Sequence, residues 1–262
     1  MKILQGLIGL LFSLLAMNVM AETSEEKEYV RVIEKEEKRE SEVDFVLSAR
    51  FGWDWAKVGK SQHVKLLDFD PAPDYFKTDN EWSTRPFIGG FLGLEFPIVN
   101  QYNLWQTGFS FYQTRVFSTS GVDYFLSEPD FGDREYHYSI RNQRVMFENK
   151  WLHQIHKRVY VYLLGGIGAA FNKAYNYHEV SLEPHTPADG IFSEHTKTSF
   201  TYSIGLGTEV AFTKHIRAGL GYQFSDLGKV SLGDYNNGNT DDTITTSNTS
   251  TNELVMQLSY IF

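Results

Sequence analysis

The last twelve residues of the chain alternate between apolar and polar side chains with a period of two. The apolar face consists of Leu254, Met256, Leu258, Tyr260 and Phe262. The opposite face contains Glu253, Gln257 and Ser259, with Val255 and Ile261 as apolar exceptions. A period of two predicts a β-strand with one face in an apolar environment and the other in a polar one. The strand runs to a terminal phenylalanine, which is typical of the closing strand of a transmembrane barrel.

The same alternation begins at Val43 and recurs along the chain. It predicts eight strands: Val43–Trp55, Thr84–Phe96, Asn103–Phe117, Arg134–Trp151, Arg158–Lys173, Thr198–Phe212, Ile216–Ser225 and the C-terminal segment. Each is near or above the length of about 9–11 residues that a tilted strand needs to cross a bilayer. The fourth segment is the least regular, because its alternation is clear only from Tyr136 to Ile140. We expect a β-bulge there.

The connections between these segments alternate in length. Three are short: Pro97–Tyr102, Leu152–Lys157 and Thr213–His215. Four are long: Ala56–Ser83, Ser118–Asp133, Ala174–Lys197 and Asp226–Ser250. Short periplasmic turns and long external loops are typical of bacterial barrels. The sequence therefore predicts an all-β fold, an eight-stranded antiparallel up-and-down transmembrane β-barrel over residues 43–262. A ten-stranded barrel is the alternative if His63–Phe69 pairs within the first loop, and a β-sandwich is a weaker one.

Two segments precede the predicted barrel. Residues 1–21 combine Lys2, an apolar stretch and small residues at Val19 and Ala21, which predicts a signal peptide for export through the Sec pathway. A single transmembrane anchor is disfavoured because the apolar stretch is short. Residues 22–42 are rich in charge and predict a periplasmic linker. The chain has no cysteine, so no disulfide or lipid-modified cysteine is expected.

Composition narrows the classes of partner. Aromatic residues make up 15% of the chain, which suits the aromatic girdles of membrane barrels. The formal net charge of −9 argues against a nucleic-acid partner, which would require a basic surface. No residue pattern assigns a cofactor, a metal or a catalytic group.

Three segments carry a resemblance to a known family: Pro86–Phe96 (PFIGGFLGLEF), Tyr160–Phe171 (YVYLLGGIGAAF) and the closing LSYIF. They resemble the OmpA/opacity-type eight-stranded barrels of Gram-negative bacteria, over about residues 43–262. The resemblance implies a place in the outer membrane, contact with its lipid and lipopolysaccharide, and insertion by the barrel assembly machinery. Tyr260 and Phe262 would form part of the assembly signal. Similar proteins include adhesins, surface antigens and small porins, and we expect a monomer.

The inward face of the predicted barrel carries charges of both signs. Glu95, Glu209 and Arg217 fall near its periplasmic end, and Arg50 and Glu253 also point inward. We expect these five residues to form a lumen ion network, because an unpaired charge there would be costly. In particular, Glu209 is expected to approach Arg217 across the short turn, with Glu95 joining from the far wall. The alternative to a structural network is a gate that opens when the pairing changes.

The long loops contain apolar residues that suit an interaction surface or a cap. The candidates are Phe69, Tyr75, Phe76, Tyr124 and Phe125. The first reading predicts a non-enzymatic outer-membrane surface protein whose loops bind a host or another extracellular ligand. The alternative is a narrow porin. The third is an outer-membrane lipid-modifying enzyme, for which His137, Ser139 and Glu148 would have to converge.

Overall fold

The computed structural model describes residues 43–262, apart from residues 67–70, 80–81, 99, 185–189 and 237–241. The predicted signal peptide (residues 1–21) and linker (residues 22–42) lie outside the described residues and stay predictions. In the described part of the chain, no helix is long and apolar enough to cross a membrane.

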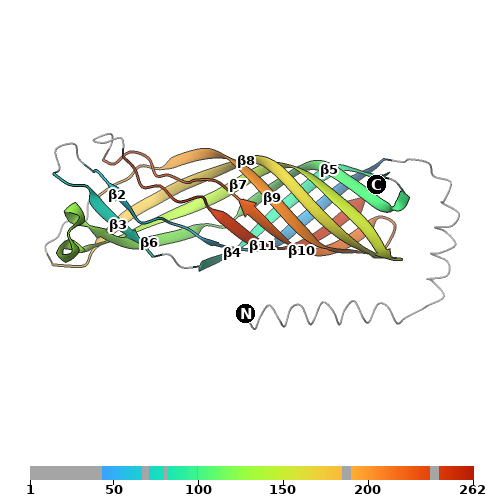
Figure 1. Cartoon of the computed structure of the whole chain (residues 1–262), viewed down its shortest axis with the longest axis horizontal. Helices are drawn as coiled ribbons and strands as arrows, with labels where there is room; N and C mark the ends of the chain where they lie inside the picture. The colour runs from blue at the N-terminus through green and yellow to red at the C-terminus, as the bar shows by residue number, and fades with distance from the viewer. Residues whose placement is uncertain (1–42, 67–70, 80–81, 99, 185–189, 237–241) are drawn as a thin grey trace, which may run out of the picture. The chain divides into compact units, whose positions relative to one another are not determined.

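Eight antiparallel strands close into a ring (Figure 1). In order around the ring they are β1 (Asp44–Lys57), β4 (Trp82–Ile98), β5 (Asn100–Thr114), β7 (Arg134–His156), β8 (Val159–Ser181), β9 (His195–Ala211), β10 (Ile216–Asp226) and β11 (Ser250–Ile261). The C-terminal strand closes the ring against the first one, with Val46 opposite Ile261 and Ala56 opposite Thr251. Each ring strand overlaps one of the eight predicted segments, so the predicted eight-stranded barrel is confirmed.

Three shorter strands lie outside the ring, at the end that carries the long connections, which we call the loop end. They are β2 (Gln62–Val64), β3 (Asp74–Thr78) and β6 (Phe117–Tyr124). β6 pairs with the first part of β7, β3 pairs with β6, and β2 pairs with β3 (Figure 1). The segment at His63 thus pairs within the first long loop, but not with a ring strand. The barrel therefore has eight strands and not ten.

The outer face of the ring carries a belt of exposed apolar side chains. Its members are 41% to 64% exposed and include Leu47, Phe51, Ile88, Leu92, Phe109, Phe147, Leu163, Ile167, Ile204, Leu206 and Leu258. The alternating positions, such as Ser48, Arg50 and Asp54, are buried inside the ring. An apolar outside around a polar inside is the reverse of a water-soluble fold and fits a barrel in lipid. The β-sandwich alternative is therefore wrong.

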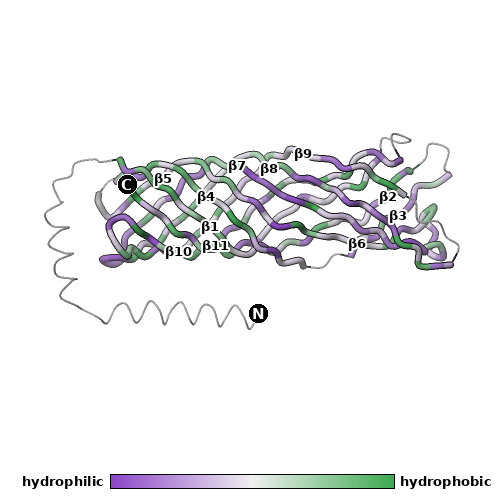
Figure 2. Tube along the Cα trace, turned by 180° about the vertical axis from the view of Figure 1, so that it is seen from behind, coloured by the Kyte–Doolittle hydropathy of each residue, from purple (hydrophilic) through white to green (hydrophobic). Residues whose placement is uncertain are grey.

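β7 shows where the barrel leaves the apolar belt. From Tyr136 to Leu152 the even-numbered residues are buried and the odd-numbered ones point outward. From Val145 to Trp151 the outward side chains are mainly apolar, and the inward ones include Arg144 and Lys150. Before Arg141 the polarity reverses: Tyr136, Tyr138 and Ile140 are buried, and the outward residues are polar. Figure 2 shows the hydrophilic stretches of β7 and β8 toward the loop end.

β7 and β8 each contain 23 residues, about twice the 9–11 needed to cross a bilayer. The residues of β7 before Arg141 and their partners on β8, together with β2, β3 and β6, form a sheet beyond the belt, which we call the extension. The bulge expected in the irregular part of the fourth segment is absent, because the side chains of β7 alternate without a break from Tyr136 to Leu152. The β7–β8 register does shift, between His137 and Ser139. The extra residue belongs to β8 at Asn176, whose φ is +57°.

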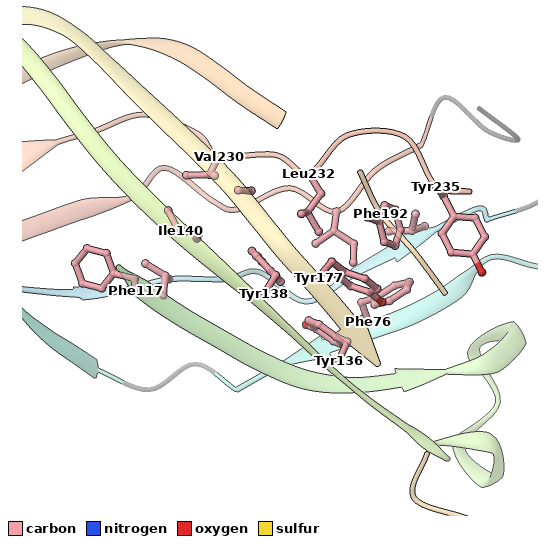
Figure 3. Close-up of a cluster of buried hydrophobic side chains, with 14 of the residues drawn as sticks. Phe76, Phe117, Tyr136, Tyr138, Ile140, Tyr177, Phe192, Val230, Leu232 and Tyr235 are labelled. Atoms are coloured by element: carbon pink, nitrogen blue, oxygen red, sulfur yellow. The ribbon is translucent and has the colours of Figure 1, made fainter. Parts of the chain in front are cut away.

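A cluster of buried apolar side chains fills the interior of the extension, and we call it the cap (Figure 3). All four long connections contribute to it. Its larger members are Phe76, Phe117, Tyr136, Tyr138, Ile140, Tyr177, Phe192, Val230, Leu232, Tyr235 and Ile244. The extension is thus built like a soluble domain, with an apolar core and a polar surface, and it is joined directly to a barrel of the opposite polarity.

Candidate functional site

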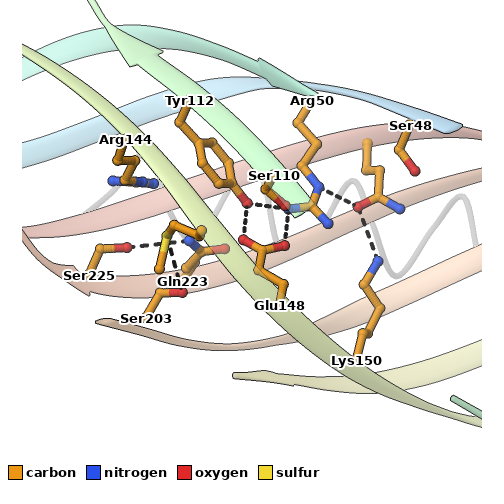
Figure 4. Close-up of polar contacts among 12 residues, drawn as sticks. Ser48, Arg50, Ser110, Tyr112, Arg144, Glu148, Lys150, Ser203, Gln223 and Ser225 are labelled. Atoms are coloured by element: carbon orange, nitrogen blue, oxygen red, sulfur yellow. Dashed lines mark hydrogen bonds and ion pairs between the residues drawn. The ribbon is translucent and has the colours of Figure 1, made fainter. Parts of the chain in front are cut away.

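Arg50 is the centre of the polar network inside the ring (Figure 4). Its side chain extends from β1 and is 2% exposed. It donates to Glu148 Oε2 on β7 at 2.6 Å and to Gln257 Oε1 on β11 at 2.9 Å, and it also contacts the hydroxyl of Tyr112 on β5. Tyr112 in turn donates to the other oxygen of Glu148 at 2.7 Å. One guanidinium therefore links strands from opposite sides of the ring.

Two ion pairs lie near the end of the ring that carries the short turns, which we call the turn end. Arg217 binds Glu95 with both terminal nitrogens, at 2.5 and 2.8 Å. Glu209 binds Lys150 of β7 at 2.8 Å. Glu95 thus reaches Arg217 from another part of the wall, as expected, whereas the ion-pair partner of Glu209 is Lys150, two strands away, and not Arg217.

Glu253 lies nearer the loop end of the lumen and pairs with Arg144 of β7 at 2.6 Å. The guanidinium of Arg144 also lies over the ring of Tyr112, 4.3 Å from its centroid. All five charged residues assigned to the lumen from the sequence are thus buried inside the ring, each with a partner of opposite charge. Buried ion pairs of this kind are costly to break, because removing one partner leaves an uncompensated charge.

Three partners in this network were not identified from the sequence: Arg144, Glu148 and Lys150. All three lie on β7. Along this strand the apolar residues pass from the inward to the outward face, although the side chains continue to alternate without a shift. The apolar residues in the early part of the strand are even-numbered and lie inside. Taking them as lipid-facing, like the apolar residues of the other strands, places the later even-numbered charges on the wrong face. Counting parity from the apolar outward residues Val145 and Phe147 would have found them. Arg115, which follows the end of β5, is exposed.

Apolar layers lie on both sides of the polar network. Val46, Phe91 and Ile261 form one buried cluster, near the turn end. Phe87, Tyr112, Met146 and Val255 form another. Several inward positions are glycines because large side chains occupy the space in front of them: a Cβ at Gly89 would lie 2.7 Å from the Tyr112 ring. The described side chains therefore fill much of the barrel interior.

The loop residues predicted as interaction candidates separate into two groups. Phe76 is fully buried in the cap, with its ring 5.3 Å from Tyr136 and 6.2 Å from Phe192. Tyr75 and Tyr124 are half-buried and lie beside each other on β3 and β6, with ring centroids 6.0 Å apart. Phe125 is 41% exposed on the turn η1 (Phe125–Ser127). Phe69 lies outside the described residues.

A buried acidic cluster surrounds Arg134 in the extension. Its guanidinium lies 3.2 Å from Asp123, and 3.8 Å from both Asp74 and Glu179. Burial raises the pKa of Asp123 to about 8, because the charged form is poorly solvated. Arg134 opposes this rise, whereas the carboxylates of Asp74, Glu179 and Asp133 add to it. Asp123 therefore changes its charge close to neutral pH.

The residues considered for lipid hydrolysis do not converge. His137 and Ser139 point outward from β7, whereas Glu148 is buried in the lumen on the opposite face. His137 instead contacts Glu135 at 3.4 Å and stacks on His178, with ring centroids 5.1 Å apart. A base, a nucleophile and an orienting acid must lie within hydrogen-bond reach of one another. Among the described residues there is also no group of His, Asp and Glu arranged to hold a metal ion.

Fold and surface together define a transmembrane β-barrel. Residues 9–262 match the family described as "Outer membrane protein beta-barrel domain", and the chain belongs to this family. Its place is therefore the outer membrane, and the loop end faces the exterior. No curated protein sequence matches the chain.

Solved structures with a similar fold come from several bacteria. Neisserial surface protein A is 11% identical, with 83% of this chain and 97% of that chain covered and a TM-score of 0.38. OprG from Pseudomonas aeruginosa is 12% identical, with coverage of 84% and 95% and a TM-score of 0.44. The outer membrane protease OmpT from Escherichia coli is 12% identical, with coverage of 86% and 98% and a TM-score of 0.42.

Proposed function

We propose that this protein is a non-enzymatic surface protein of the outer membrane that binds an extracellular ligand through the tip of its extension. The observation that carries the proposal is a group of exposed apolar side chains far from the lipid belt. Phe125 is 41% exposed, Phe131 52%, Val180 46% and Leu182 51%. They come from the turns after β6 and from the end of β8.

These residues lie on two segments that are hydrogen-bonded to each other. Leu182 donates its backbone N–H to the carbonyl oxygen of Asp133 at 2.6 Å, two residues after Phe131. The cap lies inside the extension that carries these residues, and Tyr177 and Phe76 are buried in it. Large apolar side chains exposed to water on a rigid, packed base are typical of a binding surface.

A narrow porin is the second candidate, and one observation favours it. Polar atoms inside the lumen, among them Arg50 Nη2, Asp54 Oδ1 and Glu209 Oε2, have no hydrogen-bond partner among the described residues. Such atoms would form hydrogen bonds with water inside the barrel, the arginine nitrogen as donor and the carboxylate oxygens as acceptors. The filled interior and the cap argue against an open path. Bilayer recording of the wild type and of Arg217→Glu tests this candidate, because a gate held by the Glu95 pair would change its conductance.

The binding proposal is tested with bacteria that display the protein. Their adherence to surfaces coated with laminin, fibronectin or collagen, and to epithelial cells, is compared with that of an empty-vector strain. The double variant Phe125→Ser, Phe131→Ser should reduce adherence at least tenfold, since full burial of one phenylalanine contributes about 1.5–3 kcal/mol and about 1.4 kcal/mol is a factor of ten. The matched control is Glu128→Ser, Asp130→Ser on the same turns. Adherence no better than the empty vector, or unchanged in the double variant, would contradict the proposal.

The proposal includes a route to the membrane. We propose that residues 1–21 direct Sec export and that Tyr260 and Phe262 present the closing strand to the barrel assembly machinery. Both side chains point outward, Tyr260 44% and Phe262 63% exposed, with their rings 4.9 Å apart. We also propose that the protein acts as a monomer. The lipid-modifying alternative predicts fatty-acid release from lipopolysaccharide that His137→Ala abolishes.

A further inference from the structure

Three cations form a row on the outer face of neighbouring strands. Arg141 of β7 lies directly opposite Lys173 of β8. Arg115 follows the end of β5, where Gln113 pairs with Gln143, so it continues the same outward row on the other side of Arg141. Arg115 and Arg141 are exposed, and the side chain of Lys173 is 39% exposed. Three adjacent strands thus each contribute one positive charge to one surface.

The row lies at the outer edge of the lipid belt. The outward residue two positions nearer the turn end of β8 is Phe171, which is 40% exposed. On β5, Phe111 precedes Gln113 and Arg115 on the same face and is 45% exposed. Beyond the row, the outward side chains belong to the extension. The cations therefore sit at the height where the apolar belt ends and lipid headgroups begin.

Among the described residues, a carboxylate neutralises only one of the three cations in the row. Like charges directly opposite each other on neighbouring strands repel. Lys173 has one carboxylate partner, Glu194 Oε2 at 2.6 Å. Within the part of the chain that the structure describes, neither Arg115 nor Arg141 forms an ion pair. The Tyr175 ring holds two of the cations in place, since both Arg141 and Lys173 lie 5.5 Å from its centroid.

We propose that Arg115, Arg141 and Lys173 bind the phosphate groups of a phosphorylated glycolipid in the outer leaflet. Guanidinium groups match phosphate oxygens with two parallel hydrogen bonds, and a lysine adds a point charge. The exposed Phe111 and Phe171 next to the row would contact the acyl chains of the same molecule. A lipid supplies both groups at this height, whereas a soluble phosphate supplies only the charge. The site is independent of any ligand bound at the tip of the extension.

The test uses the full chain in detergent micelles and lipid A as the probe. Binding of bisphosphorylated lipid A and of its dephosphorylated form is measured by native mass spectrometry. The double variant Arg115→Gln, Arg141→Gln should bind the bisphosphorylated form roughly 20-fold more weakly, because each cation near an anionic lipid contributes about fivefold. The control, Lys157→Gln with Lys214→Gln, removes the same charge from the short turns at the other end. A further variant, Arg115→Lys with Arg141→Lys, should retain most of the binding.

The outcomes separate the proposal from its alternatives. Weaker binding in the double variant only, together with a preference for the phosphorylated form, supports it. Equal weakening in the control would show an effect of net charge alone and overturn the site. Equal binding of the dephosphorylated form, or displacement of lipid A by millimolar inorganic phosphate, would overturn the lipid as its ligand. Heat-modifiable mobility on SDS gels verifies that every variant is folded before binding is measured.

Discussion

Asp123 should make the stability of the extension depend on pH near neutrality. Its carboxyl is fully buried between Arg134, Asp74 and Glu179, and its pKa is about 8. When the extension opens, the side chain becomes solvated and its pKa returns to about 3.9. A pKa that is higher in the closed state means that stability is fully present below the opened-state value. That stability is lost as pH rises, until pH passes the closed-state value near 8.

The size of the effect follows from the two pKa values. Between pH 6 and pH 8 Asp123 is ionised in the opened state and protonated in the closed state. The free energy of opening therefore falls by about 1.4 kcal/mol for each pH unit. From pH 6 to pH 9 the extension should lose about 3 kcal/mol, which is about a 100-fold change in the opening equilibrium. Asp123→Asn, which resembles the protonated acid and cannot titrate, should remove this dependence.

Hydrogen exchange of the β6 amides measures the opening directly. The ratio of wild-type to variant protection is compared at pH 6 and pH 9, because the ratio cancels the intrinsic effect of pH on exchange. It should fall about 100-fold over this range. Asp130→Asn on the exposed turn η2 (Pro129–Phe131) is the control and should show no such trend. A ratio that stays constant for Asp123→Asn would refute the reasoning.

Three further predictions concern the lumen, the cap and the strand contacts. Lys150→Met leaves the buried charge of Glu209 without its lysine and should destabilise the barrel by about 3–5 kcal/mol in urea unfolding from vesicles. Phe76→Ala should destabilise the cap by about 3–5 kcal/mol and speed proteolysis of residues 62–78, while the barrel keeps its heat-modifiable mobility. Gly168→Ala should lower refolding yield into vesicles, because the new Cβ overlaps the backbone oxygen of Val145.

Each of these has a matched comparison. Adding Glu209→Gln to Lys150→Met removes both charges and should recover part of the lost stability, so no recovery would argue against the pair. Phe125→Ala, at an exposed position, should leave proteolysis of the extension unchanged. Gly165→Ala should refold normally, since nothing lies within 4 Å of its added Cβ. Equal refolding of the two glycine variants would show that the close approach at Gly168 is unimportant.

Local alternation was sufficient to predict the ring. In the apolar belt, lipid on one side and the lumen on the other impose opposite polarities on successive residues, as Leu258 and Gln257 show on β11. That constraint acts on each strand separately, so strand number, loop order and the inward placement of Arg50, Glu95 and Glu253 could be predicted residue by residue.

The ion-pair partners in the lumen and the existence of the extension could be recognised only from the tertiary structure. Glu209 reaches Lys150 and not Arg217 because the partner of a long side chain in a narrow barrel is set by ring closure and stagger, which sequence neighbours do not report. β7 keeps its parity while its surroundings change from lipid to water, so the apolar residues Tyr138 and Phe147 mark opposite faces of one strand. The sequence by itself determined which residues alternate and, within the belt, which side faces lipid. Only the fold decided where the surroundings of a strand change from lipid to water and which partner each inward charge meets.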